Sequence, residues 1–306
     1  MSDPASAGRH SAATVSSVRR FVAAADRLPS PRGVALRVLE LSRDPDVGIA
    51  EIAHVIKGDP SLAGRVIHAA NAARFAGKAQ VVDVSQAVAR LGVNTVKSLS
   101  IAVSVVDGGN RPSCRPFDYE RFWGHSLFCA IAVSQVASSG MLRGEEAFAL
   151  GLLSQIGALA LATADPDGFA SVLEASSARE LHTLEQEAYG FDHDALSAVL
   201  LTDWGVPQRY TDVVLWRRDP EQGGYGWSSP EYRLATELQM ADAMADVCLG
   251  GTLRRRDALA WCAKRMHLDP ESLCELSQVV ISEWSGWSAE LGIRCSAPVP
   301  LDGMAG

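Results

Sequence analysis

The chain has 306 residues, of which 47% are hydrophobic and 21% are charged, and its formal net charge is −8. This composition is ordinary for a globular protein, and the length allows one large domain or two small ones. The acidic balance argues against a protein that binds duplex DNA, because contacts with phosphates need a basic surface.

Neither the cysteines nor the chain ends indicate export or membrane insertion. The six cysteines include no Cys-x-x-Cys pair, so neither a zinc knuckle nor a disulfide framework is indicated. No apolar run approaches the length of a membrane span, and residues 1–17 lack the basic and apolar regions of a signal peptide. We therefore expect a cytoplasmic protein without membrane contact, with a disordered tail at 1–17 and a flexible tail at 296–306.

Residues 18–106 carry the patterns of five short amphipathic helices. Asp59 before Pro60 is an N-cap acid followed by a first-turn proline, and Gly92 is typical of a residue just past a helix end. The other expected start signals are Pro31, Asp46 and Asn94. Together these helices predict a compact N-terminal lobe, which we expect to end at a Gly-rich and Pro-containing linker over 107–117.

A second series of helical patterns follows the linker. It predicts helices over 119–139, 144–163, 166–176, 178–189, 192–203, 207–218, 230–249, 255–266 and 270–291. We assign 118–220 to a larger helical lobe and 221–295 to a C-terminal extension that completes it. Because no segment has a convincing strand pattern, the sequence predicts an all-α fold of two packed lobes.

Short phrases of characteristic residues follow one another along the chain, at 28–31, 56–62, 69–77, 84–92, 122–126, 145–157, 187–193 and 204–207. In order and spacing this set resembles the HDOD family, the HD-related output domain, a non-catalytic branch of the HD phosphohydrolase superfamily. Within these phrases we expect structural roles for Pro31, Asp59, Pro60, Asn71, Gly77, Gly92, Gly151, Gly157 and Trp204. One phrase is weak evidence, but the ordered set is specific.

Resemblance to the HD superfamily also implies where a metal site would lie. His125 matches the first histidine of that site, Asp242 matches the last aspartate, and His193 matches a later histidine loosely. The central His-Asp pair is replaced by Ser154 and Gln155, which are poor ligands for a hydrolytic metal.

Arg217 and Arg218 stand where a histidine phrase often follows the preceding tryptophan. An arginine cannot ligate a metal, and its charge would repel one. We therefore expect a degenerate site with no catalytic metal and no cofactor. A pocket for a small anion, formed by Arg217, His125 and Gln155, is a further possibility.

The resemblance implies a non-enzymatic signalling module that binds a protein partner, with links to cyclic dinucleotide signalling or motility. Candidate contact residues are Trp216, Arg218, Tyr225 and Trp227. One alternative is a divergent metal-dependent phosphohydrolase or phosphodiesterase. A second is a nucleic-acid-binding regulator, with a basic stripe formed by Arg65, Arg74, Lys78, Arg90 and Lys97.

Overall fold

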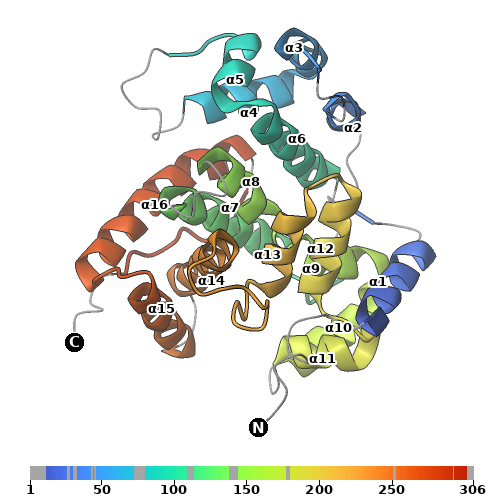
Figure 1. Cartoon of the computed structure of the whole chain (residues 1–306), viewed down its shortest axis with the longest axis vertical. Helices are drawn as coiled ribbons and strands as arrows, with labels where there is room; N and C mark the ends of the chain where they lie inside the picture. Colours follow the sequence, from blue (N-terminus) through green and yellow to red (C-terminus); the bar gives the residue numbers. More distant parts are fainter. Residues whose placement is uncertain are drawn as a thin grey trace.

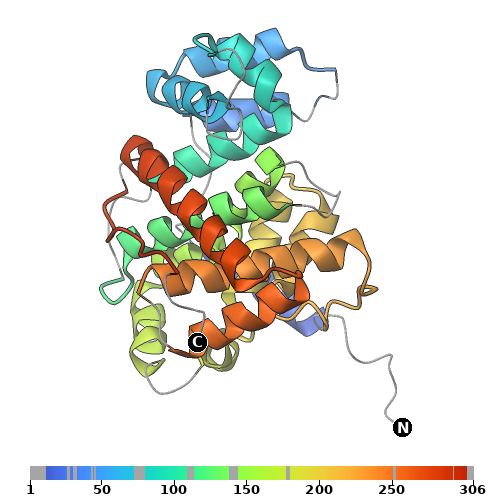
Figure 2. The same ribbon diagram turned by 90° about the vertical axis from the view of Figure 1, so that its left-hand side faces the viewer.

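A computed structural model describes residues 12–25, 28–29, 33–42, 44, 46–71, 80–108, 114–137, 144–176, 180–250, 253–291 and 293–301. Within these ranges the chain forms sixteen α-helices and no strand, so the all-α prediction is confirmed. The helices divide into a small lobe and a larger one (Figures 1 and 2).

The small lobe contains the five helices expected in this region. They are α2 (Gly33–Leu41), α3 (Ile49–Lys57), α4 (Pro60–Ala70), α5 (Val84–Leu91) and α6 (Val93–Gly108). Helix α6 packs against α2 in its own lobe and against α8 of the larger lobe. It therefore joins the two lobes, as Figure 2 shows at their junction.

Local hydrogen bonds explain two of the turns in this lobe. Asp59 Oδ1 accepts the backbone N–H of Leu62 at 3.1 Å, which is the predicted N-cap of α4. The side chain of Asn71 donates to the carbonyl of Val81 at 2.7 Å and accepts from its N–H at 2.9 Å. Asn71 thus closes the segment between α4 and α5. Pro31 and Gly77 lie outside the described residues.

Two expected helix starts in this lobe are wrong. Helix α3 begins after Gly48, which is its N-cap, and not after Asp46. Asn94 lies inside α6, which begins at Val93, directly after Gly92. Gly92 adopts φ +85, a conformation that favours glycine. The chain changes direction at this single residue and α6 begins at the next one, so Asn94 is not the N-cap of α6.

The larger lobe contains the remaining helices except α1. They are α7 (Tyr119–Val136), α8 (Gly144–Leu153), α9 (Ile156–Ala164), α10 (Pro166–Ala175), α11 (Leu181–Tyr189), α12 (His193–Asp203), α13 (Gln208–Trp216), α14 (Pro230–Cys248), α15 (Leu253–Arg265) and α16 (Pro270–Leu291). Every residue from Phe122 to Val133 is buried, and α7 packs against α8, α14 and α16. A helix that is buried all round forms the centre of a core.

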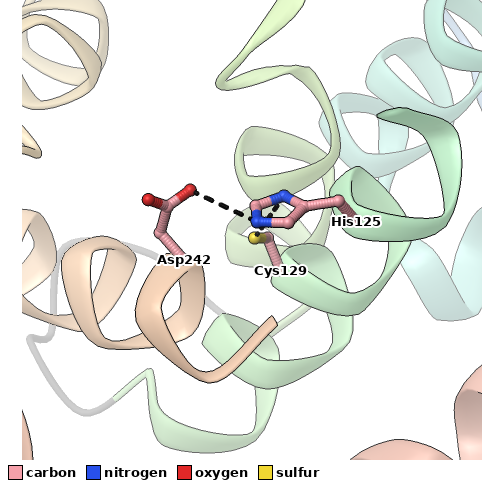
Figure 3. Close-up of side chains that lie close together, drawn as sticks. All are labelled: His125, Cys129 and Asp242. Atoms are coloured by element: carbon pink, nitrogen blue, oxygen red, sulfur yellow. Dashed lines mark hydrogen bonds and ion pairs between the residues drawn. The ribbon is translucent and has the colours of Figure 1, made fainter. Parts of the chain in front are cut away.

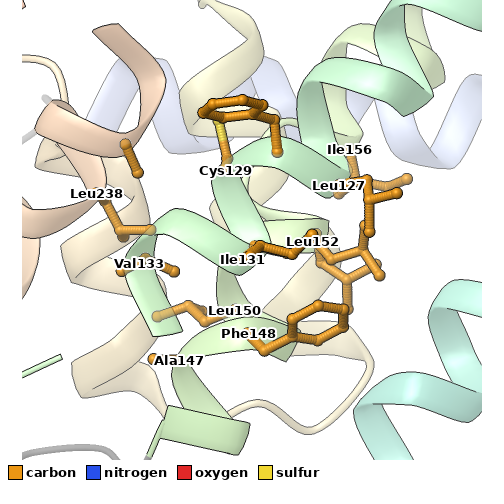
Figure 4. Close-up of a cluster of buried hydrophobic side chains, with 14 of the residues drawn as sticks. Leu127, Cys129, Ile131, Val133, Ala147, Phe148, Leu150, Leu152, Ile156 and Leu238 are labelled. Carbon is orange, nitrogen blue, oxygen red and sulfur yellow. The ribbon is translucent and has the colours of Figure 1, made fainter. Parts of the chain in front are cut away.

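Side chains of α7, α8 and α14 belong to one hydrophobic core, which includes Leu127, Ile131, Phe148, Leu152 and Leu238 (Figure 4). Glycine sets the distance between two of these helices. A Cβ on Gly151 would lie 2.8 Å from the Cα of Ala130, so α8 crosses α7 with backbone against backbone. The expected structural role of Gly151 fits this contact.

The predicted single helix over 144–163 is wrong, because a turn at Ser154 and Gln155 separates α8 from α9. The Ser154 N–H donates to the carbonyl of Gly151, three residues back, and Gln155 leaves the helical region with φ −108 and ψ 14. An apolar pattern that continues through a turn does not reveal the turn, since both helices are buried.

Residues 146–164 also correct our expectation that no apolar run is long enough to span a membrane. This stretch has the required length and composition, with a mean hydropathy of 1.7. However, 83% of it is buried inside the protein. That is the pattern of a core segment.

The N-terminal tail prediction is wrong from residue 12 onward. Helix α1 (Ala12–Ala24) packs against α12 of the larger lobe and lies far from the other N-terminal helices (Figure 1). Arg19 binds both carboxylate oxygens of Asp203, at 2.7 and 2.8 Å, and Phe21 packs edge-on against Tyr189 and Phe191. Tertiary contacts, which a local composition cannot reveal, hold this helix in place. Residues 1–11 lie outside the described chain.

The expected tail at 296–306 is also packed as far as residue 301. The N–H of Val299 donates to the carbonyl of Cys248 at 2.8 Å, and that of Leu301 donates to Ser277 Oγ at 3.3 Å. Leu301 is only 5% exposed, so this segment covers the space between α14 and α16. Residues 302–306 lie outside the described chain.

Candidate functional site

Helices α7 and α14 bring His125 and Asp242 together, as the motif positions predict. His125 Nε2 lies 3.8 Å from Asp242 Oδ1 and 3.3 Å from Oδ1 of Asp246, one turn further along α14. On the other side of the ring, His125 Nδ1 lies 3.5 Å from the sulfur of Cys129 (Figure 3). A His, a Cys and an Asp therefore meet in the buried centre of the larger lobe.

Gln155 occupies the gap between these groups. Its side-chain nitrogen donates to Asp242 Oδ1 and lies 3.2 Å from His125 Nδ1. Burial lowers the pKa of His125, but contacts with Cys129, Asp246 and Asp242 raise it well above 6.5. The Gln155 contact opposes this rise, because an amide N–H satisfies Nδ1 only when the ring is neutral.

Ser154 does not join this cluster. Its hydroxyl donates to the carbonyl of Gly151 at 2.8 Å, and its side chain is buried in the turn. Of the two residues that replace the His-Asp pair, only Gln155 reaches the candidate site.

Arg217 connects the carboxylates of two helices. Its Nε and Nη2 atoms lie 3.0 and 2.7 Å from Asp194 Oδ1, and its Nη1 atom lies 3.1 Å from Asp242 Oδ1. The side chain is only 3% exposed. Burial opposes its charge, but Asp194 and Asp242 raise the pKa of Arg217 further above its usual range. Arg217 is therefore a permanent buried cation at the centre of the site.

The charge of Arg217 lowers the pKa values of Asp194 and Asp242. Burial raises the pKa of Asp194, yet Arg217 and His193 together bring it well below 3.8. Asp242 is affected in the same way, since Arg217 and His125 outweigh burial and lower its pKa to about 2. Both carboxylates are ionised at neutral pH. Charged groups that are buried at this depth are stable only when they are paired in this manner.

His193 and Glu185 form the far end of the same network. His193 Nδ1 lies 2.8 Å from both oxygens of Glu185, which is fully buried and also accepts the backbone N–H of His193. Burial lowers the pKa of His193, but Glu185 and Asp194 raise it above 6.5. In metalloproteins a carboxylate often orients a ligating histidine in this way.

His182 closes this end of the network. Its Nε2 atom lies 3.1 Å from Asp194 Oδ2, and its ring lies 4.3 Å from that of His193. Burial and the neighbouring charge of His193 lower the pKa of His182 below its usual 6.5.

The residues of this site do not fit a hydrolytic metal centre. His125, Cys129 and Asp242 place ligand atoms within 4.8 Å of one another, and so do His182, Glu185 and His193. However, two N–H donors, from Gln155 and Arg217, already bind Asp242 Oδ1. A fixed guanidinium charge 3.1 Å from Asp242 Oδ1 opposes a divalent cation, and the neutral amide of Gln155 stands at the motif position of the aspartate.

Several members of the network could not be found from motif matching. Cys129, His182, Glu185, Asp194 and Asp246 all contact predicted site residues. One usable signal was present, because His193 and Asp194 form a His-Asp dipeptide at the start of a helix whose following residues are mostly apolar. A pair of titratable residues in a buried helix needs partners.

The residues expected at a contact surface lie in different environments. Arg218 is 42% exposed, and its Nε atom lies 3.5 Å from Asp194 Oδ2, so it touches the buried network from outside. Trp216 is half-buried, whereas Trp227 is 71% exposed. Tyr225 is half-buried, and Gly223 packs against both the Tyr225 ring and the Trp216 indole. These two rings are therefore only partly accessible to a protein partner. Trp204 is buried as expected.

The expected basic stripe is largely engaged in the protein's own contacts. Arg90 donates to the carbonyl of Ala70, and Lys97 donates to that of Gly205 in the other lobe. Arg65 also has partners within the protein, and Arg74 and Lys78 lie outside the described residues. The described residues of the stripe therefore have partners inside the protein, although the bonds of Arg90 and Lys97 to carbonyls leave their positive charges in place.

Solved structures support the fold over almost the whole chain. An HDOD domain protein of unknown function from Geobacter sulfurreducens aligns with 90% of the chain and 98% of its own length, at a TM-score of 0.68 and 20% identity. A protein from Shewanella amazonensis, provisionally described as a phosphohydrolase, covers 93% of the chain and 97% of itself, at a TM-score of 0.64 and 25% identity. A protein from Marinobacter aquaeolei, provisionally described as a signal transduction protein, covers 90% of the chain and 64% of itself, at a TM-score of 0.62 and 22% identity.

Sequence comparison gives a narrower match. A Treponema pallidum protein of uncharacterised role is 23% identical over 198 residues, which are 62% of this chain. The chain spans 38% of that relative's length. The profile described as the HDOD domain matches residues 28–220, which are more than half of the chain. The match begins before α2 and ends after Arg218, so it includes the small lobe. It also includes most of the charged network, which we define as His125, His182, Glu185, His193, Asp194, Arg217, Arg218, Asp242 and Asp246. By this match the chain belongs to the HDOD domain family.

Proposed function

We propose that this chain is a non-enzymatic regulatory module of bacterial signal transduction, acting in the cytoplasm by binding another protein. The observation that carries the proposal is the guanidinium of Arg217, which binds Asp242, a residue at a metal-ligand position of the HD resemblance, and also binds Asp194. A centre that is neutralised by the protein's own cation has little capacity to hold a catalytic metal. It supports a structural role for the charged network.

Arg218 is the residue through which we propose that a protein partner contacts the buried ion pairs. It is the exposed neighbour of Arg217, and it approaches Asp194 at 3.5 Å. An acidic group of a partner can pair with Arg218 at the surface, where the side chain is accessible. Cyclic dinucleotide signalling or motility remains the pathway that we expect for such a module.

Cross-linking in the native host tests this proposal. We expect one protein to be captured by the wild-type chain and to be lost with Arg218→Glu. Arg209→Glu is the matched control, because Arg209 is an exposed arginine on the neighbouring α13 whose guanidinium stacks on Tyr210. Capture that is equal for all three proteins would contradict a contact through Arg218.

A metal-dependent phosphohydrolase is the second candidate, favoured by the likeness to the Shewanella amazonensis protein and by the His125, Cys129 and Asp242 cluster. After incubation with Mn²⁺, Fe²⁺ or Zn²⁺ and desalting, we expect less than stoichiometric metal and no hydrolysis of phosphodiesters. Stoichiometric metal with turnover that His125→Ala abolishes would establish this candidate and overturn the first.

A further inference from the structure

A second pocket lies away from the charged network, where the start of α14 meets the end of α15. It has a volume of about 610 Å³ and is lined by Trp227, Tyr232, Arg233, Glu237, Arg265 and His267, among others. Pockets that hold small organic ligands have volumes of roughly 300–1,000 Å³. The pocket is therefore large enough for a single small molecule.

One side of the pocket is lined by the Arg265 guanidinium together with the rings of Trp227 and Tyr232, and the ring of Trp261 packs on Arg265 from outside the lining. The Arg265 guanidinium lies 4.3 Å from the ring centre of Trp261, 5.2 Å from that of Trp227 and 5.3 Å from that of Tyr232. Glu221 holds the same guanidinium at 2.7 Å. This side of the pocket is thus held by several contacts, yet Trp227 remains 71% exposed. A planar ring can stack on this platform without rearranging it.

The rest of the lining is polar. Thr236 and Glu237 are buried at the base, and the phenol oxygen of Tyr232 is buried without a hydrogen-bond partner among the described residues. Arg233 is exposed at the rim. His267 adopts φ +57 just past the end of α15, where the N–H of Leu268 donates to the carbonyl of Ala263 at 2.9 Å, so its left-handed backbone belongs to the C-terminal cap of that helix.

We infer that this pocket binds a nucleoside phosphate. The base stacks on Trp227 beside the Arg265 guanidinium, and the phosphate lies at the rim with Arg233. Thr236 and Glu237 offer hydrogen-bonding groups to the N–H and O–H groups of the base or ribose. An aliphatic anion would leave the aromatic platform unused, and an uncharged aromatic compound would leave Arg233 unused. A ligand that combines a flat ring, polar edges and a phosphate matches all three parts of the lining.

The nucleotide pocket does not include Arg218, the residue proposed above to contact a protein partner. Its buried base lies on α14, the helix that also carries Asp242 and Asp246. A ligand in the pocket would therefore contact the same helix as the charged network, about one and a half turns away from Asp242.

Isothermal titration calorimetry with the full chain tests the inference. The probes are GMP, AMP, UMP, the corresponding nucleosides and inorganic phosphate. We expect at least one nucleotide to bind at least about tenfold more tightly than its nucleoside and than phosphate alone. Trp227→Ala and Arg233→Ala should each weaken that binding about tenfold or more, whereas Arg209→Ala should leave it unchanged.

Two results would overturn the inference. One is the absence of binding by the wild-type chain for every nucleotide at millimolar concentration. The other is binding that Trp227→Ala and Arg233→Ala do not weaken, or that inorganic phosphate reproduces. Circular dichroism and the melting temperature of each variant separate loss of the site from loss of the fold. Because capture of a protein partner through Arg218 is measured separately, failure of one proposal leaves the other intact.

Discussion

Arg217 and Asp194 form a buried ion pair in which two guanidinium nitrogens, Nε and Nη2, approach the same carboxylate oxygen at 3.0 and 2.7 Å. Arg217 is the C-cap residue of α13 and Asp194 lies in the first turn of α12, and the two side chains are 3% and 4% exposed. Neither charge has bulk water as an alternative partner. The pair therefore specifies how these two helices meet, and its removal should affect stability more than any surface charge.

Replacing Arg217 with Ala should lower the free energy of unfolding by roughly 3–5 kcal/mol, because Asp194 and Asp242 would keep buried negative charges without their main partner. Arg218→Ala is the matched control. Its side chain is 42% exposed, so the expected loss is below about 1 kcal/mol. Urea unfolding followed by circular dichroism measures both. Equal losses for the two variants would argue against a central role for Arg217.

A methyl group at Gly157 should be destabilising by about 1–3 kcal/mol. Its Cβ would collide with the carbonyl oxygen of His193 and lie 2.8 Å from the Ser197 nitrogen, which would force α9 away from α12. Gly286 of α16 is the contrasting site, since a Cβ there meets nothing within 4 Å. Gly286→Ala should stabilise the protein by roughly 0.5–1 kcal/mol. Thermal melts of the two variants should shift in opposite directions.

The stability of the protein should depend on pH through His193 on the alkaline side. Its pKa is raised above 6.5, so its contribution is fully present below pH 6.5 and is lost as the pH rises through the folded-state pKa. His182 acts in the opposite sense, because its pKa is lowered and its contribution is lost as the pH falls below 6.5. Unfolding free energies measured from pH 5 to 9 should decline less on the alkaline side in His193→Gln than in the wild type.

Acid should weaken the same network through its carboxylates. The pKa of Asp242 is lowered to about 2 and that of Asp194 lies well below 3.8, so their contribution is present above pH 3.8 and is lost as the pH falls toward 2. In Asp194→Asn this loss should be smaller, and the protein should already be less stable at neutral pH. If the free energy of unfolding of Asp194→Asn fell with acid as steeply as that of the wild type, other carboxylates would account for the acid sensitivity.

Packing rather than charge should hold α1 in place. Phe21→Ala removes a ring that contacts Tyr189 and Phe191, and we expect a loss of ~2 kcal/mol. Arg19→Ala removes the ion pair with Asp203, whose side chains are 48% and 37% exposed, and should cost less than about 1 kcal/mol. Limited proteolysis between α1 and α2 should be faster in the first variant only.

Much of the architecture could be predicted from the sequence because its signals are local. Asp59 and Pro60 mark the start of α4, Gly92 marks a reversal, and the apolar periodicity marks most of the helices. Helix α1 and the turn at Ser154 have no such local signal. The first depends on contacts with α12, and the second interrupts a continuous apolar pattern.

The candidate site divides in the same way. His125 and Asp242 occupy motif positions, so their meeting could be expected. The inward direction of Arg217 could not be expected, because an arginine at the end of a helix is normally exposed, and here its buried position depends on the carboxylates of Asp194 and Asp242. Glu185 and His182 lie on a separate helix, and their contacts depend on how α11 and α12 pack.

The turn between α8 and α9 has a consequence for how such a fold changes its chemistry. The side chains of its two residues make different contacts. Ser154 donates to the backbone carbonyl of Gly151 in its own turn, whereas Gln155 donates to Asp242 in the buried centre of the larger lobe. The neighbouring glycines, Gly151 and Gly157, secure the two helices independently of both side chains. Substitutions within the turn can therefore add or remove reactive groups while the scaffold stays the same, so architecture and reactivity can diverge separately in related chains.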